Sequence, residues 1–531
     1  MEAQDLENIE EEDPVTLSGS ASVTTSYYTT SDSIQRRQPY GYRLSLNPTV
    51  GVYGIRFPFS FVITEQGDQF SQPFNRFGVA PEYKWIKAHI GYSSMQFSPL
   101  TMDGKTFLGG GVELRPGIFR FSAFYGRIKK PTSGPTKNVA QRQFKRNAFG
   151  AKIGVGTNNN YIDLIFFKAK DKLKSLDLRD SLMNATPARS NLVTGISGKL
   201  SLFKNSLVFK LDVAGSAFTR NIRATDLGDD LPGVVTGIYE PNITTNLTWA
   251  GKTSLMLNLK NFSFGPTYRR INPSFNSMGL NYISDDVEEI TFNTSFSLLE
   301  GKLSTSAQYG IQRNNLNEKH TSKTTRNIGS LNINYNPSQT FGVSAQYSNF
   351  SVDQKVVRDT IINDSLLVQQ VNHNINLIPR LTFVNRKHVH NIVLALGYQA
   401  LMDESYANNQ MFNANLNYSL SLIQSGWRFG GGLNYNQFDR AQFSTERYGF
   451  TLSANKPFFD RKMQLGLSSS YNISQRSGED ESGNIINTSL NASYSISSKH
   501  SLKMNLSLLS NNTPGRDFTE FRGSLTYSMR F

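Results

Sequence analysis

The two histidines His388 and His390 have the spacing that best suits metal chemistry in this sequence. Residues two apart lie on one face of a β-strand, where two imidazoles can bind a metal ion once a third ligand joins them. No third ligand is evident near them, and the remaining histidines are scattered along the chain. The chain also has no cysteine, which excludes thiolate metal sites and cysteine nucleophiles. We therefore expect no metal site and no cofactor, and we interpret these histidines as ordinary strand-end residues.

Other features typical of catalysis or ligand binding are incomplete. Gly251-Lys252-Thr253 resembles the end of a phosphate-binding loop, but Asn246 stands where the first glycine is required, and the segment has a strand pattern. No Ser/His/Asp spacing indicates a hydrolase, although a triad formed only in space remains open. We expect the protein not to be an enzyme. Acidic clusters without EF-hand spacing are interpreted as solvated loop tips rather than calcium sites; they are Asp229-Asp230, Asp285-Asp286 with Glu288-Glu289, and Glu479-Asp480-Glu481.

Four short motifs combine an aspartate, a hydroxyl residue and an aliphatic residue. They are Asp32-Ser33-Ile34, Asp180-Ser181-Leu182, Asp359-Thr360-Ile361 and Asp364-Ser365-Leu366, and all lie in expected surface loops. The pattern is similar to an O-glycosylation motif of some Gram-negative bacteria. That resemblance implies Ser33, Ser181, Thr360 and Ser365 as sugar acceptors, while a chance occurrence of so short a motif is the competing interpretation.

The elements that must position all these residues are β-strands. From Thr16 onward apolar and polar residues alternate with a period of two, which gives each strand one apolar and one polar face. No run of ~20 apolar residues exists that would predict a membrane-spanning helix. We expect an all-β fold, a single large antiparallel transmembrane barrel of about 26 strands (24–28) over residues 16–531. The strands are expected near 16–30, 41–50, 55–64, 73–81, 87–94, 107–114, 118–127, 145–155, 160–170, 191–203, 206–218, 244–258, 262–271, 290–298, 303–311, 331–335, 341–347, 370–384, 388–400, 412–422, 427–437, 445–456, 461–475, 485–497, 500–510 and 518–531.

The connections between these strands fall into two kinds. Very short turns are expected at 204–205, 260–261, 300–301, 337–338 and 498–499, and long polar loops at 129–144, 171–190, 219–243, 272–288 and 351–369. Counting back from the last strand puts all short turns at one end of the barrel and all long loops at the other. An even number of strands then puts both termini at the end that carries the short turns.

The last strand, residues 518–531, alternates Phe521, Gly523, Leu525, Tyr527, Met529 and Phe531 with polar residues and ends on an aromatic residue. It resembles the closing strand of a Gram-negative outer-membrane β-barrel. The resemblance implies that Phe531, with Met529 and Tyr527, is the signal recognised by the outer-membrane assembly machinery. It also implies contact with outer-membrane lipid and lipopolysaccharide, short turns and both termini in the periplasm, and long loops outside the cell.

Charge is unevenly distributed. Residues 1–13 carry seven acidic and no basic residues, so residues 14–531 carry 55 − 34 = +21. We interpret residues 1–15 as a disordered acidic periplasmic tail. The basic residues form no compact nucleic-acid-binding element, so we expect no nucleic acid partner and a positively charged lumen or periplasmic rim. Arg522 and Arg530 are expected to face the lumen; the adjacent Arg269 and Arg270 must face opposite ways.

The expected size of the barrel limits its function. Barrels of 16–18 strands already enclose a water channel, so ~26 strands would leave the membrane leaky unless infolded loops or partner proteins fill the lumen or the barrel is flattened. Only about 15 residues precede the first strand, which argues against a receptor with an N-terminal plug domain. We expect a barrel for transport, secretion or assembly within a larger protein complex. The alternatives are a non-conducting structural or surface-interaction barrel, and, less favoured, a simple anion-preferring porin or a soluble β-repeat protein.

Overall fold

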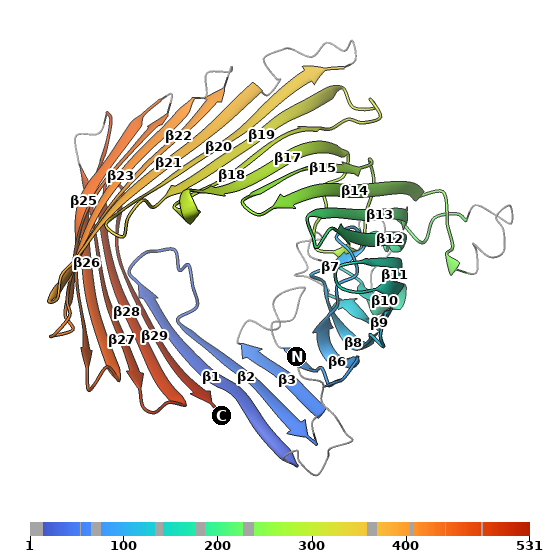
Figure 1. Cartoon of the computed structure of the whole chain (residues 1–531), viewed down its shortest axis with the longest axis horizontal. Helices are drawn as coiled ribbons and strands as arrows, with labels where there is room; N and C mark the ends of the chain where they lie inside the picture. Colours follow the sequence, from blue (N-terminus) through green and yellow to red (C-terminus); the bar gives the residue numbers. More distant parts are fainter. Residues whose placement is uncertain are drawn as a thin grey trace.

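The chain folds into one closed, antiparallel, all-β barrel (Figure 1). The computed structural model describes residues 14–53, 55–64, 76–132, 142–176, 186–226, 238–357, 369–403, 408–440, 442–478 and 482–531. The wall has 26 strands, because β4 and β5 are two pieces of a single strand position between β3 and β6. The expected strand number is therefore confirmed, and a soluble repeat architecture such as a propeller is excluded.

The strands of the first half of the wall are β1 (Val15–Thr30), β2 (Tyr40–Val52), β3 (Ile55–Thr64), β4 (Arg76–Val79), β5 (Glu82–Tyr83), β6 (Ile86–Ser94), β8 (Thr106–Leu114), β9 (Phe119–Lys129), β10 (Lys145–Gly156), β11 (Tyr161–Lys172), β12 (Ser190–Leu202), β13 (Leu207–Thr219), β14 (Thr245–Leu259) and β15 (Phe262–Ile271).

The second half comprises β17 (Val287–Leu298), β18 (Leu303–Arg313), β19 (Ser322–Tyr335), β20 (Phe341–Val356), β21 (Gln369–Val384), β22 (His388–Asp403), β23 (Asn409–Leu422), β24 (Arg428–Arg440), β25 (Ser444–Phe458), β26 (Met463–Arg476), β27 (Gly483–Ser495), β28 (His500–Thr513) and β29 (Arg516–Arg530). Two single 3₁₀ turns, η3 (Leu173–Ser175) and η4 (Leu299–Gly301), adjoin strands, and no described helix is long and apolar enough to cross a bilayer.

The first and last strands close the barrel. β1 pairs antiparallel with β29 from Ser20 opposite Arg530 to Thr30 opposite Glu520. The backbone N–H of Gly19 donates to the carbonyl of Phe531 (2.8 Å), and the N–H of Phe531 donates back to Gly19 (3.1 Å). Both described ends of the wall therefore lie at the same rim, as the even strand number requires. We call this rim, which carries the short turns, the turn end, and the opposite rim the loop end.

Side chains alternate between the two faces of the wall as expected. Ile153 of β10 lies opposite Leu164 of β11 in the ladder, and both are more than half exposed on the outer face. Lys152 and Asp163, one residue away from them, are buried on the inner face. An apolar outer face and a polar inner face are the arrangement of a barrel that meets lipid outside and water inside.

The strands are longer than the alternating segments of the sequence. β28 and β29 are paired as far as Thr513 and Arg516, so only Pro514 and Gly515 connect them at the loop end, where a seven-residue connection was expected. Gly515 has a φ of 73°, which suits glycine in such a tight turn. The hydrophobic pattern marks the part of a strand that faces the apolar outside, whereas the hydrogen-bonded ladder continues beyond it through polar residues such as Asn511.

The strand expected at 73–81 is divided in two. Arg76–Val79 and Glu82–Tyr83 flank a break at Ala80-Pro81, and residues 73–75 lie outside the described part. Pro81 has no N–H to donate to the ladder, but its carbonyl accepts from Ala88 (2.8 Å), while Ala80 donates to the carbonyl of Pro58 (3.0 Å). The strand position is therefore kept across the break.

Candidate functional site

Two connections from the loop end fold into the barrel and cover part of its inner wall. Residues 95–105 contain β7 (Met102–Asp103) and residues 272–286 contain β16 (Gly279–Leu280); the two short strands pair in parallel. Figure 1 shows β7 on the lumen side of β12 and β13. We call these two connections the infolded segments. They confirm the expectation that loops occupy part of the lumen.

An apolar cluster holds the infolded segments against the wall. Met102 and Phe275 contribute from the segments, and Phe107, Phe167 and Val193 contribute from the inner face of the strands; all are almost fully buried. Burying side chains of this size against one another is worth about 1.5–3 kcal/mol each relative to exposure. The segments are therefore packed parts of the fold rather than loops lying loosely in the lumen.

Polar contacts fix the position of the second segment. Asn191 on β12, which is 0% exposed, donates to the carbonyl of Asn276 (3.2 Å) and accepts from the N–H of Met278 (3.0 Å). The hydroxyl of Ser277 donates to the carbonyl of Thr101 in the other segment. Buried backbone groups that would otherwise be unpaired are thus satisfied by the wall and by the neighbouring segment.

Lys105, at the end of the first segment, lies almost fully buried near other cations. Its Nζ donates to Oδ1 of Asn281 in the second segment (3.3 Å). Burial, and then the nearby charges of Lys129 and Arg146, lower the pKa of Lys105 to about 8. The contact between the two segments therefore includes an amine that loses its proton in mildly basic solution.

The wall beside and beneath the segments also contains paired charges. Arg120 of β9 holds the carboxylate of Asp163 with two hydrogen bonds (2.8 and 3.1 Å), and its guanidinium lies 4.3 Å from the ring centre of Tyr161. Arg146 holds Asp171 in the same bidentate way (2.7 and 3.0 Å). A buried carboxylate needs such a partner, so these pairs cancel charge on the covered side of the lumen.

A serine, a histidine and a glutamate meet on this wall. The ring of His89 lies 2.6 Å from the hydroxyl of Ser93 through Nδ1 and 2.9 Å from the carboxylate of Glu113 through Nε2. In hydrolytic triads Nε2 serves the serine and Nδ1 the acid, the reverse of the order here. His89 is also buried, so we interpret the group as a polar link between β6 and β8.

The opposite wall, β19–β28, has uncharged polar inner positions over most of its height. Cross-strand pairs place amides beside amides: Asn332 opposite Gln346, Asn415 opposite Asn434, and Asn491 opposite Asn505. The alternate positions on the outer face are apolar, as in Leu416 opposite Leu433. We call this the amide wall. Its further inner-face members include Asn374, Asn376, Asn413, Asn417, Asn436, Thr451, Ser453, Ser468, Ser470, Asn472, Asn487, Ser489 and Ser507.

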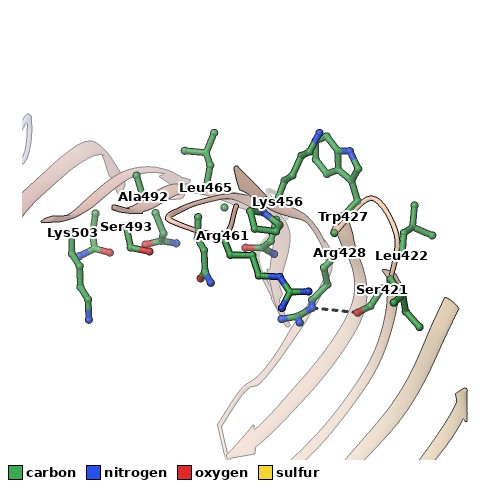
Figure 2. A pocket seen from close by; sticks show the side chains of 18 residues that line it. Ser421, Leu422, Trp427, Arg428, Lys456, Arg461, Leu465, Ala492, Ser493 and Lys503 are labelled. Carbon is green, nitrogen blue, oxygen red and sulfur yellow. Dashed lines mark hydrogen bonds between the residues drawn. The ribbon is translucent and has the colours of Figure 1, made fainter. Parts of the chain in front are cut away.

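A basic cavity lies where the amide wall meets the turn end (Figure 2). Its volume is about 570 Å³, and Arg428 of β24, Arg461 of the β25–β26 turn and Lys503 of β28 line it. The lining includes no carboxylate. Arg428 donates from Nε to the hydroxyl of Ser421 (3.3 Å). In the part of the chain that the structure describes, none of these three cations forms an ion pair.

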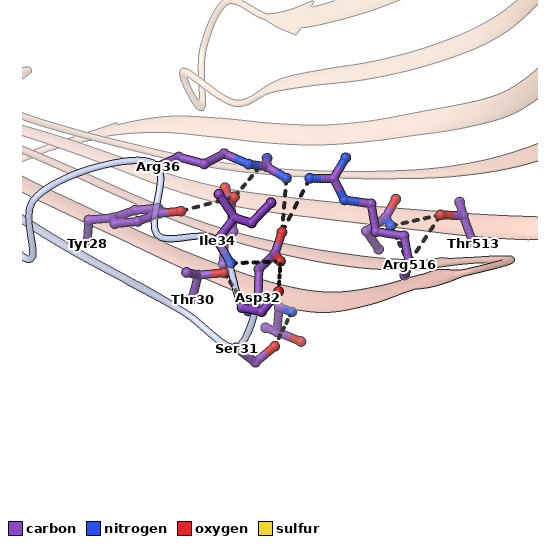
Figure 3. A network of polar contacts seen from close by, with 12 residues as sticks. Tyr28, Thr30, Ser31, Asp32, Ile34, Arg36, Thr513 and Arg516 are labelled. Atoms are coloured by element: carbon purple, nitrogen blue, oxygen red, sulfur yellow. Dashed lines mark hydrogen bonds and ion pairs between the residues drawn. The ribbon is translucent and has the colours of Figure 1, made fainter. Parts of the chain in front are cut away.

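At the loop end of the closing seam, a polar network joins the β1–β2 connection to β29 (Figure 3). Glu520, whose side chain is 1% exposed, accepts from the hydroxyl of Tyr28 (3.1 Å) and pairs with Arg36 (3.1 Å) and Arg522 (2.5 Å). Asp32 pairs with Arg36 and Arg516. A hydrogen bond from the N–H of Ile34, followed by the charges of Arg516 and Arg36, lowers the pKa of Asp32.

The structure places the residues singled out in the sequence as follows. Tyr527 and Met529 lie on the apolar outer face of β29, and Phe531 pairs with Gly19 at the turn end. Arg522 and Arg530 lie on the opposite, inner face, and Arg522 belongs to the seam network. Nothing in the structure tests the assembly role of the first three residues.

Several other sequence expectations meet the structure directly. Arg269 and Arg270 do face opposite ways, toward Glu289 and Glu288 respectively. His388 and His390 share a face, with ring centres 6.0 Å apart, and His390 contacts the hydroxyl of Tyr418 (2.9 Å). Among the described residues no group of three His, Cys, Asp or Glu side chains is placed to hold a metal ion.

The interpretation of residues 285–289 as a solvated acidic tip holds for Asp285, which is exposed, but is wrong for Asp286, Glu288 and Glu289. Glu288 is buried and pairs with Arg270 and Arg313, while Asp286 accepts hydrogen bonds from the N–H groups of Asn315 and Leu316 (2.9 and 2.8 Å). These acids instead anchor the end of an infolded segment to the neighbouring connection. The sequence missed this because the arginine partners are on other strands.

Ser33 lies exposed in the β1–β2 connection at the loop end, as an acceptor site requires. Ser181, Thr360 and Ser365 lie outside the described residues, as do residues 1–13 and the acidic clusters at 229–230 and 479–481. Sequence reasoning did not find the basic cavity, because its residues come from three hairpins whose register brings them together.

Comparison with known proteins adds the following. No protein-family model matches the chain, and no curated protein matches it. Solved structures that are similar include the P pilus usher (PapC) translocation pore (13% identity, 96% of this chain and 98% of that chain, TM-score 0.36). Others are the FrpB iron transporter from Neisseria meningitidis (10%, 100% and 83%, TM-score 0.39) and Pseudomonas aeruginosa OccK11 (12%, 65% and 91%, TM-score 0.31).

Likenesses this distant carry no functional argument. The closed ladder of 26 antiparallel strands and the apolar outer face decide the architecture on their own. The chain has the architecture of an outer-membrane β-barrel. The expected resemblance is thereby confirmed at the level of the fold.

Proposed function

We propose that this barrel lies in the bacterial outer membrane and serves transport, secretion or assembly there as a conduit for hydrophilic molecules. The observation that carries the proposal is the amide wall, which is polar, uncharged over most of its height and not covered by the infolded segments. Amide and hydroxyl side chains keep a lumen hydrated, as in water-filled barrels. A hydrated wall of this kind suits passage of hydrophilic molecules better than catalysis.

The outer face supports a position in the membrane. On β14 the outward apolar residues run from Leu247 to Leu259, twelve residues apart. At ~3.3 Å per residue and a tilt of ~45°, that run spans roughly 28 Å, close to the height of an apolar belt in such barrels. Contact with outer-membrane lipid and lipopolysaccharide follows. The turn end, with both described ends of the wall, would face the periplasm, as the short turns of outer-membrane barrels do.

The proposed conduit is one subunit of a larger complex. A barrel of 26 strands has a wide cross-section, and the infolded segments cover only the wall near β6–β15. Other outer-membrane or periplasmic subunits would close or extend the remaining lumen. The assembly machinery would recognise the terminal Tyr527, Met529 and Phe531.

Conductance in planar bilayers tests the proposal. Purified, heat-modifiable barrel should form ion-conducting openings that favour anions, because Arg428, Arg461 and Lys503 at the turn end of the lumen form no ion pair within the described part of the chain. A deletion of residues 1–13, which removes seven carboxylates, should raise the conductance. Folded barrel that leaves the bilayer silent, or that selects cations, would contradict the proposal.

A non-conducting structural barrel is the second candidate, and the infolded segments favour it. They are packed through a buried apolar cluster and several hydrogen bonds, as a permanent closure would be. The two candidates differ in one measurement. A structural barrel stays silent in bilayers even when the infolded segments are released by mutation, whereas a conduit gains conductance.

A further inference from the structure

Four basic residues line the cavity at the turn end of the amide wall, together with neutral polar groups. Arg428, Arg461 and Lys503 line it together with the side chains of Asn455, Gln464, Asn491 and Asn505. In Figure 2 the guanidinium groups of Arg428 and Arg461 point to the same side of the wall, away from Trp427. Lys456, the fourth basic residue of the lining, points the other way, and its Nζ lies 4.8 Å from the ring centre of Trp427, so Arg428, Arg461 and Lys503 are the cations left for a ligand.

The charges in this cavity differ from several other arginines of the inner wall. Arg120, Arg146, Arg269 and Arg522 each hold a carboxylate. Within the described chain Arg428, Arg461 and Lys503 form no such pair. The residues opposite Arg428 and Lys503 in the ladder are uncharged: Ser421, Asn455, Ser493 and Thr526. Two guanidinium groups offer forked donors that match carboxylate or phosphate oxygens, and nearby amides can donate to the oxygens left over.

We propose that this cavity is an anion-binding site, which takes a free carboxylate- or phosphate-bearing solute at the periplasmic mouth of the lumen. The inference rests on the proposed conduit for its orientation but not for the binding itself. The volume of about 570 Å³ is ample for a group of this kind together with its water.

The chain's own acidic residues are a less suitable source of the anion. Lys503 of β28 lies opposite Thr526 of β29, which in turn lies opposite Thr24 of β1. Thr24 is nine residues along β1 from Val15, where the strand begins. Nine residues of strand measure roughly 30 Å. Four of the seven acidic residues lie at positions 10–13. A residue spans at most ~3.3–3.6 Å, so a chain that leaves the wall at Val15 would bring these four no closer than ~10 Å to Lys503. At the same span per residue Glu7 also falls short, Asp5 would have to be almost fully extended, and only Glu2 has chain to spare, so a solute from outside is the better ligand.

Arginine modification tests the site without requiring conductance. The whole folded protein in detergent is treated with phenylglyoxal, and the modification rate of each arginine is followed by mass spectrometry. Inorganic phosphate should slow modification of Arg428 and Arg461 by about fivefold or more, because it pairs with both guanidinium groups. Arg386 serves as the internal control, because it is exposed in the β21–β22 turn at the same rim and does not line the cavity. Its modification rate should change by less than about twofold, through screening of charge alone.

Two further arms identify the ligand and the donors. The experiment is repeated with protein lacking residues 1–13, and protection by phosphate should persist in both forms. The variant Lys503→Gln should weaken protection of the two arginines, whereas Lys387→Gln, which removes an equal charge from the same rim, should not. Equal protection of Arg386, or no protection of Arg428 and Arg461 in the truncated protein, would overturn the site. Silent bilayers together with clear protection would contradict the conduit and leave the site standing.

Discussion

Replacing Asn191 by leucine should release the infolded segment 272–286 from the barrel wall. Asn191 is fully buried, and its amide is the acceptor for the N–H of Met278 (3.0 Å). Leucine has the same branching at Cγ but no polar atom, so this N–H would be left unpaired in a site closed to water, and the larger methyl groups add crowding that acts in the same direction. The carbonyl of Asn276 would still accept a hydrogen bond from the hydroxyl of Ser216 (2.6 Å), so it adds little to the free-energy cost of the substitution.

The cost of one buried unpaired group is ~1–3 kcal/mol. At about 2 kcal/mol, local opening of the segment becomes about 30-fold more frequent, since each 1.4 kcal/mol is a factor of ten. Hydrogen exchange measured by mass spectrometry should therefore show the amides of 272–286 exchanging about 30-fold faster, while the strands keep their protection. A conduit should also gain conductance.

The matched control is Asn415→Leu, on the amide wall. Asn415 pairs in register with Asn434 and lies far from the infolded segments in the ladder. It should leave exchange in 272–286 unchanged. The reasoning is refuted if the Asn191 variant exchanges at the wild-type rate in this segment, or if exchange rises equally throughout the barrel.

Three further perturbations are expected to give defined results. Deletion of Phe531 should lower the amount of folded, heat-modifiable barrel in the outer membrane, and normal levels would contradict its role as assembly signal. Glu520→Gln removes a buried charge that pairs with Arg36 and Arg522. Because both arginines still reach water, the free energy of unfolding should fall by about 1–2 kcal/mol, less than the ~3–5 kcal/mol lost when a fully buried ion pair is broken. The variant should therefore show heat-modification at a lower temperature. The pKa of Asp32 is lowered in the folded protein, so the stabilisation that its charge gives to the docked residues 31–39 is complete above the ordinary carboxyl pKa of ~3.9 and is lost only as pH falls through the lower folded pKa. The rate of proteolysis of this connection should therefore be constant from about pH 5 to 8. A transition near neutral pH would show that Asp32 does not control the docking.

The strands were predictable from the sequence because the outer face of a barrel has to be apolar. Runs such as Leu331, Ile333 and Tyr335 reveal a strand by chemistry alone. The strand ends were not predictable to the same degree. Beyond the apolar belt both faces meet water, so residues such as Asn512 continue the ladder without any alternation.

The sequence contains an indication of the infolded segments. Met95, Phe97 and Phe275 are large apolar residues in connections that otherwise look polar, and apolar residues in a loop need a surface to cover them. Their destination was beyond reach, because Thr101 and Ser277 meet across 176 residues of sequence. The basic cavity needed the register of several hairpins for the same reason.

The inner face of the wall itself records where the lumen is covered. Phe124, Phe167, Val193 and Ala214 occupy inner positions of β9–β13, where a wet lumen would favour polar residues, and each of them is buried under the infolded segments. On the amide wall the corresponding inner positions are asparagine, serine and glycine. Side chains alone cannot fill a barrel of this width, so the chain covers one wall with its own loops and leaves the other hydrated. Changing one of these covered positions to a polar residue should loosen the segments, whereas the same change on the amide wall should be tolerated.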